Sequence, residues 1–124
     1  MKNVIETSNA PQAIGPYSQA IVAGNFVFVS GQIHLTPDGV LVEDTITEET
    51  HQVMKNLKAI LEAADVSFKD VVKTTVYLTD ISSFGEMNEV YKTYMNEPYS
   101  ARGTVGVKEL PRNAKIEMSM IAVK

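Results

Sequence analysis

The chain has 124 residues, a length suited to one domain, which we place at residues 1–124. Cysteine is absent, which excludes a disulfide scaffold, a thiolate zinc site and a cysteine nucleophile. The net charge is −4 and the basic residues are scattered, so no nucleic-acid partner is expected. Segment 1–20 lacks the apolar core of a signal peptide, and no stretch approaches transmembrane length. We therefore expect a cytoplasmic protein without a membrane partner.

Strand and turn signals dominate the first third of the chain. Segments 20–23 and 26–30 predict two strands, and Gly24-Asn25 between them is a hairpin signal. The turn residues of segment 36–39 lead to a short third strand, which we expect at residues 40–42. Three strands are thus expected before the first helix.

Two amphipathic helices are predicted, each beginning at a pair of residues with capping-box spacing. Thr45 and Glu48 mark the first start, and Ser83 and Glu86 mark the second. The apolar residues that follow recur at the spacing of one helix face, so both stripes are expected in the core. They are Val53, Met54, Leu57, Ile60, Leu61 and Ala64 in the first helix, and Phe84, Met87, Tyr91, Tyr94 and Met95 in the second.

Three further strands complete the predicted fold. Residues 73–78 are rich in β-branched side chains, and two more strands are expected near residues 104–107 and 115–123. The resulting order, β-β-β-α-β-α-β-β, is typical of an α+β domain with a single sheet and two helices.

One predicted strand suggests that the chain associates with itself. Residues 26–29 are apolar at both parities, so both faces of this strand favour burial. Two helices on one face of the sheet leave the other face uncovered, and a second copy of the chain is the simplest cover. The alternative is that these side chains are scattered surface apolar residues of the ordinary kind.

Arg102 and Glu117 are the candidate reactive pair. If the last two strands form an antiparallel hairpin, Arg102 faces Ser119 and Thr104 faces Glu117, which makes Arg102 and Glu117 diagonal neighbours on one face. Such a pair is either a weak surface salt bridge or a site. In a site, the guanidinium would hold a substrate carboxylate by two hydrogen bonds, and the glutamate would act on a water molecule.

Other polar residues indicate no second chemistry. His34 and His51 lack ligands at metal-binding spacing, so no metal site is expected. Asp44, Glu48 and Glu49 are interpreted as charges at a helix N-terminus and not as a catalytic pair.

Motifs along nearly the whole chain resemble those of the RidA/YjgF family. The N-terminal block Asn9–Ser18 is similar to the family's first signature, and the region around Arg102 and Glu117 is similar to its last. The blocks that carry the resemblance are Asn9–Ser18, Val29–Ile33, Asp70–Val76, Met87–Tyr91, Ala101-Arg102 with Val105, and Leu110-Pro111 through Ile116-Glu117 to Ile121–Val123.

This resemblance implies a fold and an activity. The implied fold is a chorismate-mutase-like α+β domain that forms a homotrimer with clefts between subunits. The implied enzyme is a 2-iminobutanoate/2-iminopropanoate deaminase, which hydrolyses the reactive enamines or imines 2-aminoacrylate and 2-aminocrotonate. Its products are ammonia and pyruvate or 2-oxobutyrate, and neither a cofactor nor a metal is implied.

The resemblance also assigns roles to individual residues. Arg102 would bind the substrate carboxylate, and Glu117 would position water and shuttle a proton. The remaining implied contacts to substrate are Tyr17, Ser30, Gly31, Asn88 and Thr104. Without the family, Tyr17 is more simply an interface aromatic, Ser30-Gly31 a strand end or bulge, and Asn88 an ordinary polar residue on a helix.

Several positions depart from the family's usual pattern. Gly103 and Thr104 stand where Ser and Cys are frequent, Gly106 and Ser119 replace frequent acids, and Ser100 stands where Pro is frequent. These departures leave open a non-catalytic regulatory protein that binds a small carboxylate in the same cleft. RNA cleavage or translational inhibition is a third alternative, against which the acidic charge counts.

Overall fold

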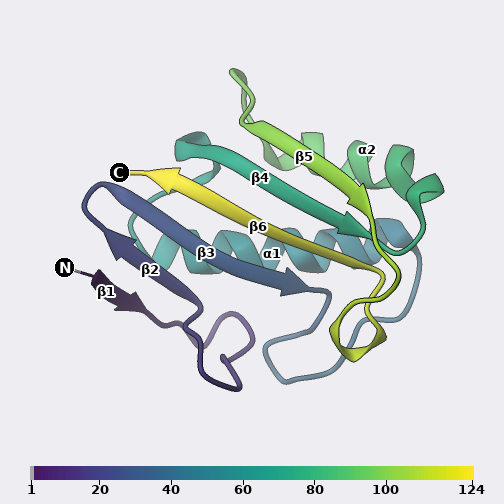
Figure 1. The fold of residues 1–124 in the computed structure, drawn as a ribbon, viewed down its shortest axis with the longest axis horizontal. Coiled ribbons are helices and arrows are strands. Elements are labelled where there is room, and N and C mark those ends of the chain that lie inside the picture. The colour runs from purple at the N-terminus through teal and green to yellow at the C-terminus, as the bar shows by residue number, and fades with distance from the viewer. Residues whose placement is uncertain (1) are drawn as a thin grey trace.

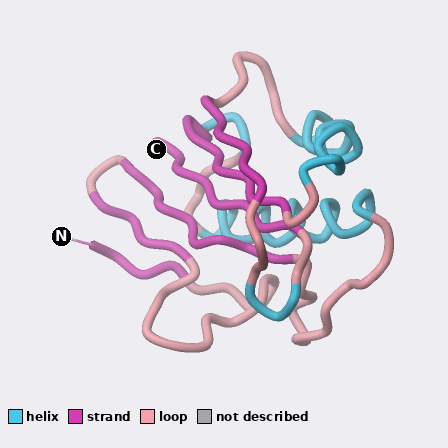
Figure 2. Tube along the Cα trace, turned by 45° about the vertical axis from the view of Figure 1, so that its right-hand side comes forward, coloured by secondary structure: helices cyan, strands magenta, loops and turns pink. Residues whose placement is uncertain are grey.

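The computed structural model describes residues 2–124, in which six strands form one mixed sheet with both α-helices on one of its faces (Figures 1 and 2). The predicted α+β class, with a single sheet and two helices, is confirmed. In chain order the elements are β1 (Lys2–Ile5), β2 (Ala20–Ala23), β3 (Phe26–Ile33), α1 (Ile46–Ala63), β4 (Val71–Leu78), α2 (Phe84–Tyr94), β5 (Ala101–Gly106) and β6 (Ile116–Val123).

The strand order in the sheet is β1-β2-β3-β6-β4-β5. Neighbouring strands are antiparallel except β4 and β5, which are parallel and are connected through α2. A parallel pair needs such a crossover, because the chain must return to the same end of the sheet. β5 is therefore an edge strand, and β6 lies between β3 and β4 near the centre (Figure 1).

At the N-terminal side one expected strand does not form, and one strand that was not expected is present. The predicted Gly24-Asn25 hairpin is confirmed, with Gly24 in the left-handed region at φ +60°. The strand expected at residues 40–42 is wrong, because only an isolated bridge between Leu35 and Leu41 forms there. The sequence also misses β1, whose residues are mostly exposed and show no clear apolar alternation.

The two helix starts have different outcomes. The capping box predicted at the start of α1 forms in part: Thr45 Oγ1 accepts a hydrogen bond from the Glu48 backbone N–H at 3.2 Å, without a return bond to the Glu48 side chain among the described residues. The capping box predicted at Ser83 is wrong: Ser83 makes no side-chain cap bond, because the 3₁₀ turn that leads into α2 holds it in a helical conformation. Glu86 instead joins the two helices, since it accepts hydrogen bonds from the Thr47 N–H at 3.2 Å and the Thr47 hydroxyl at 2.8 Å.

The core lies between the helices and one face of the sheet. In β6 every second side chain is buried and the others are half-buried, as alternation requires. In β3, Val27 and Val29 are buried, whereas Phe26 is 47% and Phe28 44% exposed on the opposite face. This second face, which we call the open face, has no cover within the described chain. Its burial by another copy stays a prediction.

Within residues 2–124, no helix combines the length and the apolar composition that crossing a bilayer would require.

Candidate functional site

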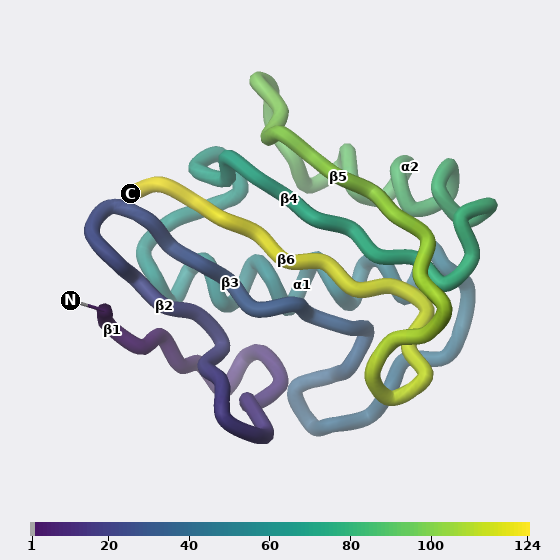
Figure 3. The backbone as a smooth tube through the Cα atoms, viewed as in Figure 1, coloured from purple at the N-terminus to yellow at the C-terminus, as the bar shows by residue number. Residues whose placement is uncertain are grey.

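Arg102 and Glu117 lie on strands that are not neighbours, so the predicted hairpin of the last two strands is wrong. β4 lies between β5 and β6, and it pairs Thr74 with Arg102 and Tyr77 with Glu117. The connection from β5 to β6 passes the end of β4 and does not fold back directly (Figure 3). The apolar match expected between Val105 and Ile116 is not kept: Val105 is paired with Tyr77 and is 47% exposed on the open face, whereas Ile116 is buried in the core.

The two side chains also lie on opposite faces of the sheet. Thr74 and Tyr77 are three residues apart on β4, so their cross-strand partners Arg102 and Glu117 belong to opposite faces. Thr74 is buried and bonded to Tyr91 of α2, which places Arg102 on the helix side. Glu117 is on the open face. Within one chain the two residues therefore cannot act on the same small molecule.

Arg102 is held in a defined position by α2. Its Nη1 donates a hydrogen bond of 2.7 Å to Asn88 Oδ1. Its guanidinium carbon lies 4.9 Å from the ring centre of Tyr91 and 5.4 Å from that of Phe84. Since a guanidinium has five N–H donors and one is used here, donors remain for a planar anion such as a carboxylate.

A cavity of about 370 Å³ adjoins this arginine. Its floor is fixed by Tyr91, whose hydroxyl donates to Thr74 Oγ1 at 3.0 Å and lies 3.2 Å from Ser100 Oγ. The residues that line the cavity are Asn88, Tyr91, Tyr99, Ser100 and Arg102. The structure thus brings together two of the predicted site residues, Arg102 and Asn88.

Four residues around Arg102 were not predicted as site residues, namely Phe84, Tyr91, Tyr99 and Ser100. Phe84 and Tyr91 were assigned to the core stripe of the second helix, and Ser100 was noted only as a departure from the family pattern. Phe84, Asn88 and Tyr91 follow each other at spacings of four and three residues, which places them on one helix face. That spacing is the signal that could have identified the surroundings of Arg102.

Glu117 occupies a second, separate position on the open face. It is half-buried, and desolvation raises the pKa of its carboxyl group above the usual value. The side chain lies directly over Gly31, where an added Cβ would be 2.8 Å from Glu117 Cδ. Gly31 is therefore needed because a larger residue would displace the carboxylate. The structure brings Gly31 and Glu117 together, as the family resemblance implies.

Ser30 joins this region to the N-terminal segment. Its hydroxyl donates a hydrogen bond of 2.6 Å to the Ser18 carbonyl, and its backbone N–H donates to the Gln19 carbonyl at 2.9 Å. The strand irregularity between Val29 and Gln32 confirms the bulge interpretation of this position. Ser30 thus serves a structural role in the single chain, and it holds the segment next to Tyr17 against β3.

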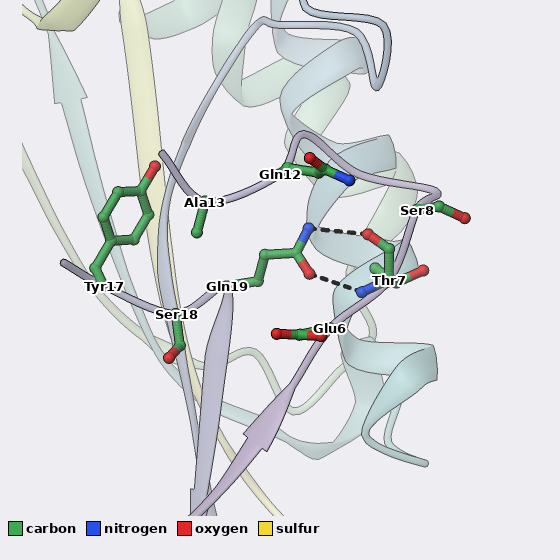
Figure 4. A pocket seen from close by; sticks show the side chains of 8 residues that line it. All are labelled: Glu6, Thr7, Ser8, Gln12, Ala13, Tyr17, Ser18 and Gln19. Atoms are coloured by element: carbon green, nitrogen blue, oxygen red, sulfur yellow. Dashed lines mark hydrogen bonds between the residues drawn. The ribbon is translucent and has the colours of Figure 1, made fainter. Parts of the chain in front are cut away.

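Tyr17 lies on the N-terminal segment beside a cavity of about 460 Å³ (Figure 4). It is 54% exposed, and its hydroxyl accepts a hydrogen bond of 3.3 Å from the Ile14 N–H. The segment is anchored by the buried amide of Gln19, which accepts from the Thr7 N–H at 2.7 Å and donates to the Thr7 carbonyl at 3.0 Å. Tyr17 and Arg102 line different cavities of the chain, so the structure does not bring them together.

Thr104 lies two residues beyond Arg102 on the same face of β5. Its hydroxyl is buried and has no hydrogen-bond partner among residues 2–124. Because β5 is an edge strand, one side of its backbone is not paired within the sheet. The substrate contact that the family resemblance implies for Thr104 stays a prediction.

The histidines have structural roles. His34 is buried, with Nδ1 2.6 Å from the Val42 carbonyl and Nε2 accepting from the Lys115 N–H at 2.9 Å. His51 Nδ1 lies 2.8 Å from the Tyr94 hydroxyl. In the part of the chain that the structure describes, no three His, Cys, Asp or Glu residues are grouped as metal ligands would be.

Comparisons with known proteins agree with this architecture. A family model described as endoribonuclease L-PSP matches residues 7–124. A RutC family protein of Pyrococcus horikoshii is 54% identical, and the match covers 100% of this chain and 99% of that protein. The 2-iminobutanoate/2-iminopropanoate deaminase of Mus musculus is 46% identical over 100% of this chain and 93% of its own length.

Solved structures show the same fold. Escherichia coli TdcF with bound serine has a TM-score of 0.93 and 40% sequence identity, with 98% of each chain covered. The family model and these full-length matches are consistent with the motifs found from residue 9 to residue 123. The chain therefore belongs to the endoribonuclease L-PSP family, which is the RidA/YjgF family that its motifs resemble.

Proposed function

We propose that this protein hydrolyses small 2-imino acids, or the enamines that tautomerise to them, to 2-keto acids and ammonia. The observation that carries the proposal is the anchored guanidinium of Arg102 beside a cavity of about 370 Å³. Such a group recognises a planar carboxylate, the permanent charge of these substrates. The deaminases among the relatives support this choice of substrate class.

The reaction needs both Arg102 and Glu117, and we propose that two chains supply them. Because the two side chains lie on opposite faces of one sheet, a site that contains both requires a second copy. A homotrimer in which the open face of one chain meets the β5 edge of the next would bring Glu117 of the first chain to Arg102 of the second. Tyr17 would approach Arg102 from the neighbouring chain, and the backbone at Ser30-Gly31 would line the same cleft.

In the proposed mechanism, Arg102 fixes the substrate carboxylate and Glu117 handles the proton. The oxygen of water bonds to the imine carbon while Glu117 takes one of its protons, and the C=N π electrons move to nitrogen. Glu117 returns that proton to nitrogen, which gives a carbinolamine. Glu117 then carries the hydroxyl proton of the carbinolamine to nitrogen, so that the C–O bond becomes C=O, the C–N bond breaks, and ammonia leaves a 2-keto acid. A carboxyl group whose pKa is raised by desolvation is suited to accept and return a proton.

Substitution of the two residues tests this division of roles. Arg102→Ala should nearly abolish both 2-oxobutyrate binding and turnover, because losing a charged hydrogen bond in a partly dry cleft costs about 2–5 kcal/mol. Arg102→Lys should stay badly impaired, since lysine cannot make the two-pronged contact. Glu117→Gln should keep keto-acid binding while turnover falls by about 10²–10⁴. Calorimetry and release of keto acid from a freshly generated enamine measure these effects.

Two matched controls are available on the same chain. Arg112→Lys alters the other arginine, and Glu62→Gln alters an exposed glutamate of α1, so both should behave as the parent protein. Tight keto-acid binding by Arg102→Ala would show that the site is wrongly assigned. Normal turnover by Glu117→Gln would remove the proton-transfer role. Activity should also survive EDTA without any added cofactor.

A regulatory binding protein is the second candidate. It is favoured by the relative TdcF, which holds serine in its solved structure, and by the departures around Arg102, such as Gly103 and Thr104. This candidate predicts saturable binding of serine or a keto acid to the parent protein, with no acceleration of imine hydrolysis. The deaminase assay therefore separates the two functions.

A further inference from the structure

Glu49 of α1 has a carboxylate oxygen that the proposed reaction does not use. The residue is 0% exposed, and its Oε2 accepts a hydrogen bond of 3.1 Å from the Asp44 N–H. Its Oε1 is buried without a hydrogen-bond partner among residues 2–124. Burying an acceptor with no donor is costly, and more so when it carries charge. A donor from outside the chain would remove that cost.

Glu49 lies in the wall of a cavity of about 230 Å³. This cavity lies where the start of α1 meets the connection from β4 to α2 and the residue before β6, and it shares no lining residue with the cavity at Arg102. The residues that line it are Ile46, Glu49, Thr79, Asp80, Ser83 and Lys115. Five of the six are polar, and all but one of those carry an oxygen in the side chain.

The charges around this cavity favour a cation. Ser82 donates hydrogen bonds of 3.0 Å from its N–H and 2.6 Å from its hydroxyl to Asp80 Oδ1, which holds the pKa of Asp80 below its usual value and keeps it ionised. Among residues 2–124, Lys92 and Glu89 form the only ion pair within 4.0 Å. Lys115 therefore makes no ion pair with Glu49 or Asp80. Two acidic side chains, Glu49 and Asp80, therefore line the cavity together with one basic side chain, Lys115.

The donor set favours a protonated amine over a metal ion. Calcium takes about six to eight oxygen ligands, and no three acidic or histidine residues are grouped in the described chain. A positive lysine in the wall would also oppose a divalent ion. A protonated amine carries one charge and several N–H donors, and these match acceptors such as Glu49 Oε1 and the unused Ser83 hydroxyl. The cavity is smaller than the roughly 300–1,000 Å³ of drug-sized sites.

We propose that this cavity binds a protonated amine, supplied by ammonium or by the amino group of a small amino acid, with Glu49 Oε1 as its main acceptor. The proposal is independent of the imine deaminase activity, because it uses none of the residues assigned to that reaction.

NMR titration of the full-length ¹⁵N-labelled protein with ammonium chloride, at constant ionic strength against sodium chloride, tests the proposal. The backbone amides of Glu49, Thr79 and Lys115 should shift and saturate. Tetramethylammonium has the same charge but no N–H donor, so it should produce no saturating shift. Equal shifts with sodium or tetramethylammonium, or tighter binding of calcium than of ammonium, would overturn the proposal.

Matched variants separate Glu49 from general effects of charge. Glu49→Gln should weaken ammonium binding at least tenfold, since the amide keeps the Asp44 contact but loses the negative charge. Glu48→Gln, an exposed neighbour in the same helical turn, should bind as the parent protein does. If Glu49→Gln disturbs the fold, which its spectrum reveals directly, Asp80→Asn at the exposed rim should still weaken binding a few-fold. If Glu49→Gln folds and binds ammonium as tightly as the parent protein does, the assignment is refuted. If Glu49→Gln does not fold, unchanged ammonium binding by Asp80→Asn refutes it.

The source of the amine is distinguished in an Arg102→Ala background, which removes the proposed substrate site. Ammonium binding should persist there, and its loss would place the amine at the substrate site and refute the new one. If glycine binds more tightly than methylammonium, and Lys115→Met removes this difference in affinity, the ligand is a small amino acid. Methylammonium that binds at least as tightly as glycine identifies ammonium or a simple amine.

Discussion

At the residue scale, the close contact between Gly31 and the Glu117 side chain restricts which residue can occupy position 31. Gly31 lies in β3 without a positive φ, so an alanine is allowed by the backbone and is opposed only by the carboxylate above it. The Glu117 side chain is half-buried and ends in a flexible tip, which can move without unfolding the strand. The glycine therefore determines where the carboxylate lies, and it matters little for whether the sheet forms.

Gly31→Ala should displace Glu117 and lower turnover by about 10–10³, part of the usual contribution of a general acid–base group. Stability should change by less than about 1 kcal/mol, as expected when a flexible side chain can move aside. The measurement is the deaminase rate together with the thermal unfolding midpoint. Gly85→Ala is the control, because a Cβ there meets nothing within 4 Å. Full activity in Gly31→Ala would show that the carboxylate position is not critical.

Glu117 also predicts a pH dependence of stability. A carboxyl group whose folded pKa is raised stabilises the fold in its protonated form. That contribution is complete below the unfolded pKa of about 4.3 and is lost as pH rises through the folded pKa. Glu117→Gln should therefore unfold at a higher temperature than the parent protein at pH 7. The difference should fade near pH 4, whereas Glu62→Gln should show no such trend. A difference that stays constant with pH would contradict burial as the cause.

At the element scale, α2 supports Arg102, the proposed carboxylate receptor. One of its faces carries Phe84, Asn88 and Tyr91, all of which contact Arg102 of β5. The Tyr91 hydroxyl donates a hydrogen bond to Thr74 of β4, and its ring contacts Arg102, so α2, β4 and the edge strand β5 are joined at this point. The parallel β4-α2-β5 unit therefore determines the orientation of the guanidinium.

Asn88→Asp should weaken this receptor without damaging the fold. The new carboxylate would pair with Arg102 at the position where Asn88 Oδ1 now accepts its hydrogen bond, and it would repel a substrate carboxylate. Binding of pyruvate should weaken at least tenfold and KM should rise, with a smaller change in kcat, because Glu117 is untouched. Calorimetry and steady-state kinetics measure this, with Asn96→Asp beyond the end of α2 as the matched control. Unchanged affinity would mean that Asn88 does not control the arginine.

At the scale of the whole molecule, the open face of the sheet exposes large apolar side chains that no other part of the described chain covers. Phe26 and Phe28 lie on it with ring centres 6.0 Å apart, and both are more than two-fifths exposed. Apolar area of this kind on the face that also carries Glu117 supports association of copies through the sheet. The same association would complete the proposed site, so assembly and activity should be lost together.

Light scattering at micromolar concentration should give the mass of a homotrimer. Phe28→Asp should convert it to monomers, because a charge on the open face would have to be buried in the assembly. Deaminase activity should fall in parallel, while circular dichroism stays that of the folded chain. Val40→Asp alters a similarly exposed apolar residue in a loop and should leave the trimer intact. A monomeric parent protein would sink the proposed shared site.

Much of the fold could be predicted from local patterns in the sequence. The spacing of Val53, Leu57 and Leu61 determines which face of α1 is buried, because helix periodicity acts over a few residues. Gly24-Asn25 determines a hairpin for the same local reason. The short strand β1 escaped prediction, since a mostly exposed edge strand gains little from apolar burial and depends on backbone pairing with β2.

For the candidate site too, the types of residue could be predicted from the sequence, whereas their arrangement in space could not. The sequence by itself determined which residues are the candidates, because the chemistry of Arg102 and Glu117 and the motifs around them predict a reactive role for both. Only the tertiary structure decided that β4 separates them and that they occupy opposite faces of the sheet. Strand neighbours are chosen by hydrogen bonds between segments distant in the chain, and alternating patterns are compatible with several neighbours. The position of Gly31 beneath Glu117 was decided in the same way, by packing across strands and not by sequence spacing.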